Sequence, residues 1–215
     1  MRNYRLGLIY VVVALAALVG CDSDKKIAVE SDKYIEYSDA KAFLKAVPLY
    51  QALGDPDIIE FFTYGCSHCQ KFAPLMTEWE RGNDDRTVVY IPVVWNETAI
   101  LHAKLFYYVK GMPEFEVLHQ GLYDLVSTFS RTDSIEDQKV MFLVYLQEQG
   151  LKPIDIIRAI DSNQFETELT FAAEMVKAFD ITGTPNVVVN SQYKVNNSAL
   201  QKLEEILTTA EQLLD

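Results

Sequence analysis

The chain has 215 residues, of which 49% are hydrophobic and 23% are charged, and its formal net charge is −12. This balance is typical of a globular protein with enough apolar residues for a core, in one domain or in one domain with an insertion. Because an acidic surface repels the phosphate backbone, we expect no nucleic-acid partner.

The first residues of the chain are typical of an export signal. Arg2 and Arg5 precede an almost unbroken apolar run over residues 6–19. This run is shorter than the roughly 20 residues that a membrane-spanning helix needs. The segment therefore predicts a secretory signal peptide that is not part of the fold.

Residues 18–21, with the sequence LVGC, resemble the lipobox of bacterial lipoproteins. The resemblance implies a lipoprotein signal peptide over residues 1–21, which ends at Cys21, and a lipid attached to the Cys21 sulfur. An ordinary cleavage near residues 14–16 or an uncleaved anchor is the alternative. Asp22 resembles the signal that retains lipoproteins in the inner membrane of enteric-type bacteria. We therefore expect a lipid-anchored protein of the bacterial cell envelope that faces the periplasm, an oxidising compartment.

Two segments lead into the expected fold. Residues 22–55 predict a charged tether and then a short helical or irregular N-terminal segment, which ends in a Gly-Asp-Pro turn. Residues 57–64 form a nearly continuous apolar run, which is typical of a central strand buried on both faces. An acidic residue inside such a strand, Glu60, requires a physical reason.

The next two segments complete a βαβ unit. Residues 67–81 repeat apolar side chains at helical spacing and predict a helix that bends near Pro74. Residues 87–95 predict a second buried strand. A strand, a helix and a strand at this spacing indicate an α/β protein with parallel strands.

The rest of the chain is predominantly helical. Residues 98–180 show helical periodicity without a convincing strand, whereas residues 186–195 predict a β-hairpin and residues 198–214 a closing amphipathic helix. We therefore predict an α/β domain over residues 56–97 and 181–215, interrupted by an all-helical insertion. Within the insertion, helices are expected over residues 99–111, 113–129, 134–150, 152–160 and 162–180.

Cys66 and Cys69 form a C-x-x-C pair between the first strand and its helix. A structural zinc site usually has four ligands, but there is one such pair, and His102 and His119 lack ligand spacing, so we expect no metal. A purely structural disulfide would close a loop of about four residues and remove little chain entropy. The junction of a strand and a helix favours thiol–disulfide exchange.

The two sulfurs would have different surroundings in the expected helix. Cys66 would lie at the helix N-terminus, where free amides and the helix dipole favour an anion. His68, when protonated, would add positive charge, although an exposed spacer without electronic effect is the alternative. Both effects lower the pKa of the Cys66 thiol below its usual value of about 8.5. Cys69, one turn further on, would be shielded and would act as the resolving thiol.

The stretch EFFTYGCSHCQKF, residues 60–72, resembles the active-site segment of DsbA-like thiol:disulfide oxidoreductases of the thioredoxin superfamily. The resemblance extends from about residue 56 to the end of the chain, and it implies a thioredoxin fold with an inserted all-helical domain. It also implies a redox-active disulfide between Cys66 and Cys69 and no other cofactor. The implied partners are unfolded or reduced exported proteins and a membrane reoxidant of the DsbB type.

Two further sites follow from this resemblance. Glu60 stands where the family has a buried acid beneath the disulfide; burial would raise its pKa and let it exchange a proton with Cys69. An exposed glutamate without a role is the alternative. The Gly-Thr-Pro sequence resembles the loop in which a cis-proline, here Pro185, packs against the sulfurs. The backbone of Thr184 would then face an incoming peptide; a trans proline that starts a strand is the alternative.

Two positions depart from the commonest DsbA pattern. Ser67 stands where proline is usual, and Thr184 stands where valine is frequent; both positions tune the redox potential and the release of substrate. We predict an oxidase that introduces disulfide bonds into exported proteins. The alternatives are a membrane-tethered reductase or isomerase and a non-catalytic peptide-binding lipoprotein.

Overall fold

The computed structural model describes residues 31–130 and 134–214. The predicted signal peptide, the predicted lipid site at Cys21 and Asp22 therefore lie outside the described residues. Within the described ranges, no helix has the length and apolar character needed to cross a membrane.

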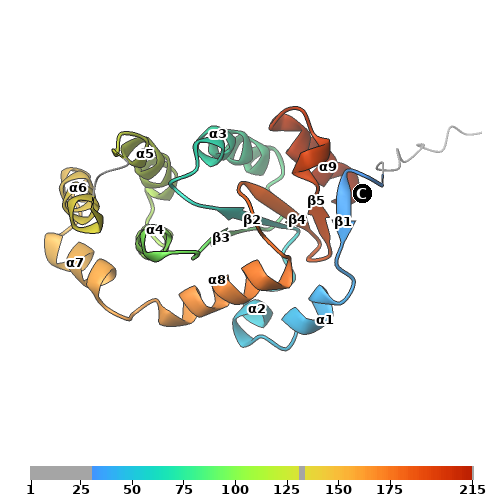
Figure 1. Cartoon of the computed structure of the whole chain (residues 1–215), viewed down its shortest axis with the longest axis horizontal. Helices are drawn as coiled ribbons and strands as arrows, with labels where there is room; N and C mark the ends of the chain where they lie inside the picture. Colours follow the sequence, from blue (N-terminus) through green and yellow to red (C-terminus); the bar gives the residue numbers. More distant parts are fainter. Residues whose placement is uncertain (1–30, 131–133, 215) are drawn as a thin grey trace, which may run out of the picture.

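A five-stranded sheet lies at the centre of one half of the molecule (Figure 1). Its order is β1-β5-β4-β2-β3, in which β2 and β3 are parallel and the other pairs are antiparallel. The predicted parallel pair and hairpin are confirmed. The strands are β1 (Tyr34–Glu36), β2 (Ile58–Phe62), β3 (Val88–Pro92), β4 (Asn186–Val189) and β5 (Tyr193–Val195).

Helices cover both faces of this sheet (Figure 1). On one face lie α3 (Ser67–Gly82) and α9 (Glu204–Leu214). On the other face lie α1 (Ala40–Leu44), α2 (Pro48–Leu53) and α8 (Glu166–Ala178). The end of the molecule away from β1 holds α4 (Glu97–Val109), α5 (Phe115–Ser127), α6 (Ile135–Glu148) and α7 (Pro153–Asp161). The described residues between β3 and β4 form helices and no strand, in agreement with the prediction.

Strand β2 is buried along its whole length, as predicted. Because side chains alternate between the two faces of a strand, Glu60 shares its face with Ile58 and Phe62. Ile58 packs with residues of α3 and α9, and Phe62 packs with residues of α4 and α5. The Glu60 side chain is therefore directed to the side of the sheet that α3 covers.

Two segments differ from the sequence prediction. Strand β1 lies where an irregular segment was expected; it has three residues and pairs with the distant β5, so local periodicity does not reveal it. The closing helix begins at Glu204, so a helix from residue 198 was wrong. A 3-10 turn precedes it, and the Asn197 side chain there donates a hydrogen bond to the Pro185 carbonyl at 2.6 Å. Such side-chain bonds compete with helix formation.

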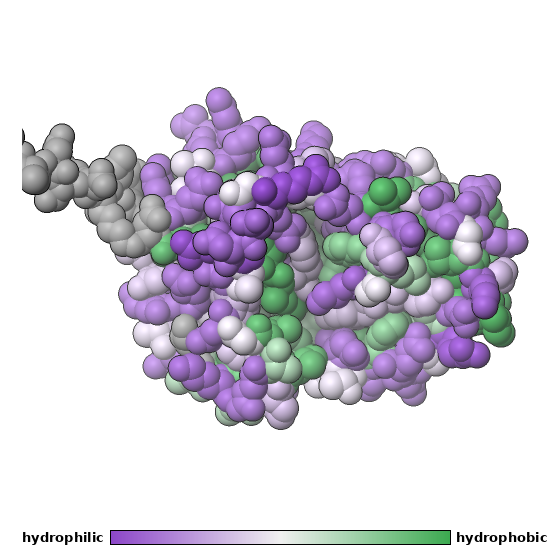
Figure 2. Space-filling view, turned by 180° about the vertical axis from the view of Figure 1, so that it is seen from behind, coloured by the Kyte–Doolittle hydropathy of each residue, from purple (hydrophilic) through white to green (hydrophobic). Residues whose placement is uncertain are grey.

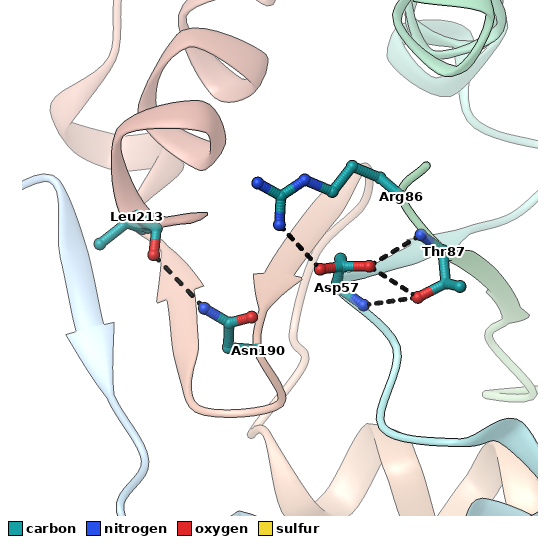
Figure 3. Close-up of polar contacts among 5 residues, drawn as sticks. All are labelled: Asp57, Arg86, Thr87, Asn190 and Leu213. Atoms are coloured by element: carbon teal, nitrogen blue, oxygen red, sulfur yellow. Dashed lines mark hydrogen bonds and ion pairs between the residues drawn. The ribbon is translucent and has the colours of Figure 1, made fainter. Parts of the chain in front are cut away.

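Polar contacts at the end of the sheet tie β2 and β3 together (Figure 3). The Asp57 carboxylate accepts hydrogen bonds of 2.8 Å from both the amide and the hydroxyl of Thr87, and it pairs with Arg86 at 3.1 Å. Nearby, the Asn190 side chain donates to the Leu213 carbonyl at 3.4 Å. Partial burial acts to raise the pKa of Asp57, but the contacts with Thr87 and Arg86 outweigh it and lower this pKa.

The molecular surface is mainly hydrophilic on the face seen in Figure 2. Hydrophobic side chains gather in its central hollow and at the end where α6 and α7 lie. Exposed aliphatic residues at that end include Val140 and Val144 of α6 and Ile154 and Ile157 of α7. The acidic chain thus presents a polar exterior that apolar patches interrupt.

Candidate active site

Cys66 caps the N-terminus of α3, so this helix begins at the cysteine pair as predicted. Its backbone is extended, with φ −105° and ψ 111°, and its sulfur accepts a hydrogen bond from the Cys69 amide at 3.2 Å. The sulfur therefore takes the place of the oxygen that a serine or aspartate cap supplies. Free helix amides and the helix dipole favour negative charge at this position.

The surroundings of the two sulfurs move their pKa values in opposite directions. The hydrogen bond from the Cys69 thiol, together with Thr184 and the amides of Cys69 and His68, outweighs burial and lowers the pKa of Cys66 to about 6. Cys69 has no exposed surface, and its burial and the neighbouring Cys66 raise its pKa. The pair therefore consists of a half-buried sulfur that ionises easily and a shielded sulfur that keeps its proton.

Ser67 and His68 form the first turn of α3, and both are exposed. The backbone amide of His68 is among the groups that lower the pKa of Cys66. The roles expected for the His68 imidazole and for the Ser67 side chain stay predictions.

The peptide bond between Thr184 and Pro185 is cis, which confirms that part of the prediction. Pro185 is buried directly before β4, and the Thr184 carbonyl accepts a hydrogen bond from the Cys66 thiol at 3.3 Å. The structure thus brings residue 184 and residue 66 together across 118 positions of sequence.

A cavity of about 300 Å³ lies beside this loop. One side is formed by His68, Thr184 and Pro185, and the other side is formed by residues 197–206. Sequence reasoning missed this second wall because it predicted a continuous helix there. The Asn-Asn-Ser turn signal at residues 196–198 and the acidic pair Glu204 and Glu205 could have indicated the later helix start.

Glu60 is buried in β2, with 1% of its surface exposed, so the alternative of an exposed glutamate is wrong. Burial, followed by the charges of Glu80 and Cys66, raises the pKa of Glu60 well above its usual value. One of its oxygens, Oε2, is buried and has no hydrogen-bond partner among the described residues. The raised pKa shifts Glu60 towards its neutral, protonated form.

Helix α5 contributes polar side chains that sequence reasoning missed. His119 Nδ1 and the Tyr64 hydroxyl form a buried hydrogen bond of 2.8 Å, and burial lowers the pKa of His119 to about 3, so the imidazole is neutral. The Tyr123 hydroxyl is buried without a partner among the described residues. Burial and then the charges of Glu60 and Cys69 raise the pKa of Tyr123. No local sequence motif predicts these residues, because only the packing of α5 brings them to the site.

The described residues include no cluster of three or more histidine, cysteine or acidic side chains that could hold a metal ion. What the arrangement does provide is an ionisable sulfur, a shielded second sulfur, a buried acid and a backbone carbonyl beside a groove. These groups suffice for thiol–disulfide exchange with an extended peptide.

Comparisons with known proteins agree with this geometry. No family model matches the chain. The chain is 27% identical over its full length to the thiol:disulfide interchange protein DsbA of Pseudomonas syringae pv. tomato, of which it covers 95%.

Solved structures confirm the fold. A variant of Pseudomonas aeruginosa DsbA superimposes with a TM-score of 0.71 and 22% identity, over 87% of this chain and 97% of that one. A variant of Proteus mirabilis DsbA with the non-covalently bound peptide PWATCDS superimposes with a TM-score of 0.65 and 18% identity, over 87% and 98% of the two chains. The architecture is thus the thioredoxin fold with a helical insertion, as predicted.

Proposed function

Since the chain is a DsbA-like thiol:disulfide oxidoreductase of the thioredoxin superfamily, we propose that it introduces disulfide bonds into exported proteins in the periplasm. The observation that carries the proposal is the asymmetry of the sulfur pair. Cys66 ionises with a pKa lowered to about 6, whereas Cys69 is fully buried and its pKa is raised. One sulfur is thus suited to meet the substrate and the other to leave and return within the protein.

The proposed cycle begins with the disulfide between Cys66 and Cys69. A substrate thiolate attacks the Cys66 sulfur, the bond between the two cysteines breaks, and Cys69 leaves as a thiolate. Glu60, protonated because its pKa is raised, supplies the proton that neutralises it. A second substrate thiolate then attacks the substrate sulfur of the mixed disulfide. The substrate gains a disulfide, Cys66 leaves as a stabilised thiolate, and two electrons remain on the enzyme.

The direction of this exchange depends on the Cys66 thiolate. Groups that stabilise the thiolate stabilise the reduced enzyme, and this makes the disulfide a stronger oxidant. A pKa lowered by one unit corresponds to about 1.4 kcal/mol, which equals about 30 mV for a two-electron couple. A lowered pKa of Cys66 therefore favours the oxidase over a reductase or an isomerase.

The substrate is proposed to bind along the loop before β4. The Thr184 carbonyl lies beside the Cys66 sulfur, next to the groove that residues 197–206 complete. An extended segment of an exported protein could pair with this backbone. The structure of Proteus mirabilis DsbA with a bound peptide supports this type of ligand.

The proposal includes a place in the cell. The likeness to DsbA proteins supports the periplasm, and Cys21 is proposed to carry a lipid that holds the enzyme at the membrane. A membrane protein of the DsbB type would reoxidise the dithiol. Mass spectrometry of the protein purified from a lipoprotein-processing host tests the lipid: the absence of a diacylglycerol mass on Cys21 would remove the anchor from the proposal.

The central test is oxidative refolding of a reduced test substrate, together with equilibration against glutathione. We expect the wild-type protein to restore the disulfides of the substrate, Cys66→Ser to act at the background rate, and Cys69→Ser to accumulate a mixed disulfide. Activity of Cys66→Ser equal to that of the wild type would refute the exchange reaction. A redox potential near that of thioredoxin, about −270 mV, would instead assign the protein as a reductase.

A further inference from the structure

A second acidic side chain, Glu80 of α3, lies close to the buried Glu60. Tyr90 of β3 lies beside Glu60 as its register partner across the parallel pair β2 and β3, although Glu60 Oε2 has no hydrogen-bond partner among the described residues. Register partners on neighbouring strands are about 4.8 Å apart and direct their side chains to the same face of the sheet. The Tyr90 hydroxyl donates a hydrogen bond of 2.5 Å to Glu80 Oε2.

Tyr90 and Glu80 also line a cavity of about 280 Å³ between α3 and α5. Its wall includes Arg81 and Glu116, which form an ion pair and are 67% and 58% exposed, so the cavity opens at the surface. A volume of this size exceeds what a water molecule needs, and the polar groups in the wall supply partners for water. Both Glu80 and the half-buried Tyr90 therefore have access to water in this cavity.

The proposed oxidase reaction creates a need for such a connection. Glu60 gives its proton to Cys69 when the mixed disulfide forms, and it must recover one before the next cycle. Only 1% of Glu60 is exposed. In the proposed complex the substrate covers Cys66 and Thr184, so we expect little access of water to Glu60 from the side of the groove.

We propose that Tyr90 and Glu80 form a proton relay between Glu60 and the water of the cavity between α3 and α5. This inference rests on the proposed function. Water in the cavity protonates the Glu80 carboxylate, Glu80 passes this proton to the Tyr90 oxygen, and the hydroxyl proton of Tyr90 moves to the Glu60 carboxylate. One proton enters and no electron moves. During reoxidation of the dithiol the same steps run in reverse, and one proton leaves.

The charges around the relay are compatible with this role. Burial raises the pKa of Glu80, although the hydrogen bond from Tyr90 opposes this, and the charge of Glu116 raises it further. Burial and the nearby Glu60 and Glu80 raise the pKa of Tyr90, so its hydroxyl keeps a proton to pass on. The cations and acids that face the relay are Arg81 and Glu116 on the cavity side and Cys66 on the sulfur side, and His119 of α5 is neutral.

Two substitutions test the relay, and each has a matched control. Tyr90→Phe removes the hydroxyl and keeps the ring, whereas Glu80→Gln keeps an acceptor but cannot be protonated in the same range. Tyr107→Phe removes a buried hydroxyl that donates to the Glu168 carbonyl at 3.3 Å, outside this cavity. Glu78→Gln removes an exposed acid from the same helix α3.

The rate constant to measure is that of reduction of the Cys66–Cys69 disulfide by a dithiol peptide, in single-turnover stopped flow at low buffer concentration. We expect Tyr90→Phe and Glu80→Gln each to lower it about tenfold, and the double variant to lower it no further, because either change interrupts the same proton path. The equilibrium with glutathione should change less than about twofold, because a relay alters the rate and not the end states. The two control variants should keep the wild-type rate.

Rescue by a small acid separates a relay from a structural role. Formic acid fits a cavity of about 280 Å³, so we expect rising formate buffer to restore the rate of Glu80→Gln and to leave the wild type unchanged. Rates equal to those of the controls, or a loss that formate does not restore, would overturn the relay. If the wild-type protein does not oxidise the test substrate, the proposed function fails instead.

Discussion

Two carboxylates at β2, Asp57 and Glu60, are three residues apart and have opposite surroundings. Asp57 lies at the end of the sheet, where its oxygens accept two hydrogen bonds from Thr87 and one from Arg86 (Figure 3). Glu60 lies in the middle of the strand, and its Oε2 has no partner among the described residues. The pKa of Asp57 is lowered, whereas the pKa of Glu60 is raised.

The difference separates a structural acid from one suited to proton transfer. When charged, Asp57 is stabilised by its donors and connects the start of β2 to β3. The pKa of Glu60 is raised, because no donor to its Oε2 compensates for the loss of water around a charge. A fold gains stability from the first arrangement and loses some through the second. An unpartnered buried acid on which the charge of Cys66 acts is thus a candidate for function, and a fully partnered one is not.

The largest expected effect is on the rate of disulfide reduction, for which Glu60 should matter and Asp57 should not. Glu60→Gln keeps the shape of the side chain but cannot supply a proton to Cys69, so the single-turnover rate of disulfide reduction should fall by roughly 100-fold. Asp57→Asn, at the residue directly before β2, is the control, and it should leave this rate within about twofold of the wild type because Asp57 lies outside the proton path. Equal losses in both variants would contradict the division of roles.

The second effect concerns stability at neutral pH. Asp57→Asn replaces a charged acceptor beside Arg86 and Thr87, and we expect it to lower the free energy of unfolding by about 2 kcal/mol in urea denaturation at pH 7. The folded-state pKa of Asp57 is lowered, so its contribution is present above the unfolded pKa of about 3.9 and is lost as pH falls through the folded pKa. The two proteins should therefore converge in acid. A difference that stays constant down to pH 2 would contradict this account.

The third effect also concerns stability, but here the substitution, Glu60→Gln, should raise the free energy of unfolding. Because the folded-state pKa of Glu60 is raised, the wild type loses stability as pH rises from the unfolded pKa of about 4.3 towards the folded value. Glu60→Gln has no such proton to lose, so it should be more stable than the wild type at pH 8 by about 1 kcal/mol, and the two should be equal near pH 4. Denaturation curves at both pH values measure the difference. A less stable Glu60→Gln at pH 8 would show that the carboxylate has partners when charged.

Local patterns were sufficient for the part of the fold around β2. The long apolar runs of β2 and β3 and the C-x-x-C spacing are local signals, and they placed Cys66 at the start of a helix. They also singled out Glu60, because an acid is unusual in a strand buried on both faces. The relay partners Tyr90 and Glu80 were not predicted. Their contact depends on the register of β2 with β3 and on the rotation of α3, which no short stretch of sequence specifies.

The N-terminal and C-terminal parts of the fold show the same limit of prediction from local sequence patterns. β1 has three residues and forms because β5 offers a free edge, so its pairing is decided by tertiary structure. Before α9, the Asn197 side chain bonds to the Pro185 carbonyl and so joins two distant loops. Long periodic elements are therefore predictable, whereas groove walls and relays, which long-range contacts create, are not.

The smallest expected effect tests which contacts make Asp57 a structural acid. The Arg86 side chain is 34% exposed, so solvent and salt screen its charge. Arg86→Gln should therefore cost only about 0.5 kcal/mol of unfolding free energy at low salt, and about zero in 1 M NaCl. Both bonds from Thr87 remain in this variant, so the pKa of Asp57, followed by NMR, should stay below its usual value. If Arg86→Gln cost as much as Asp57→Asn, the ion pair and not the Thr87 hydrogen bonds would distinguish Asp57 from Glu60.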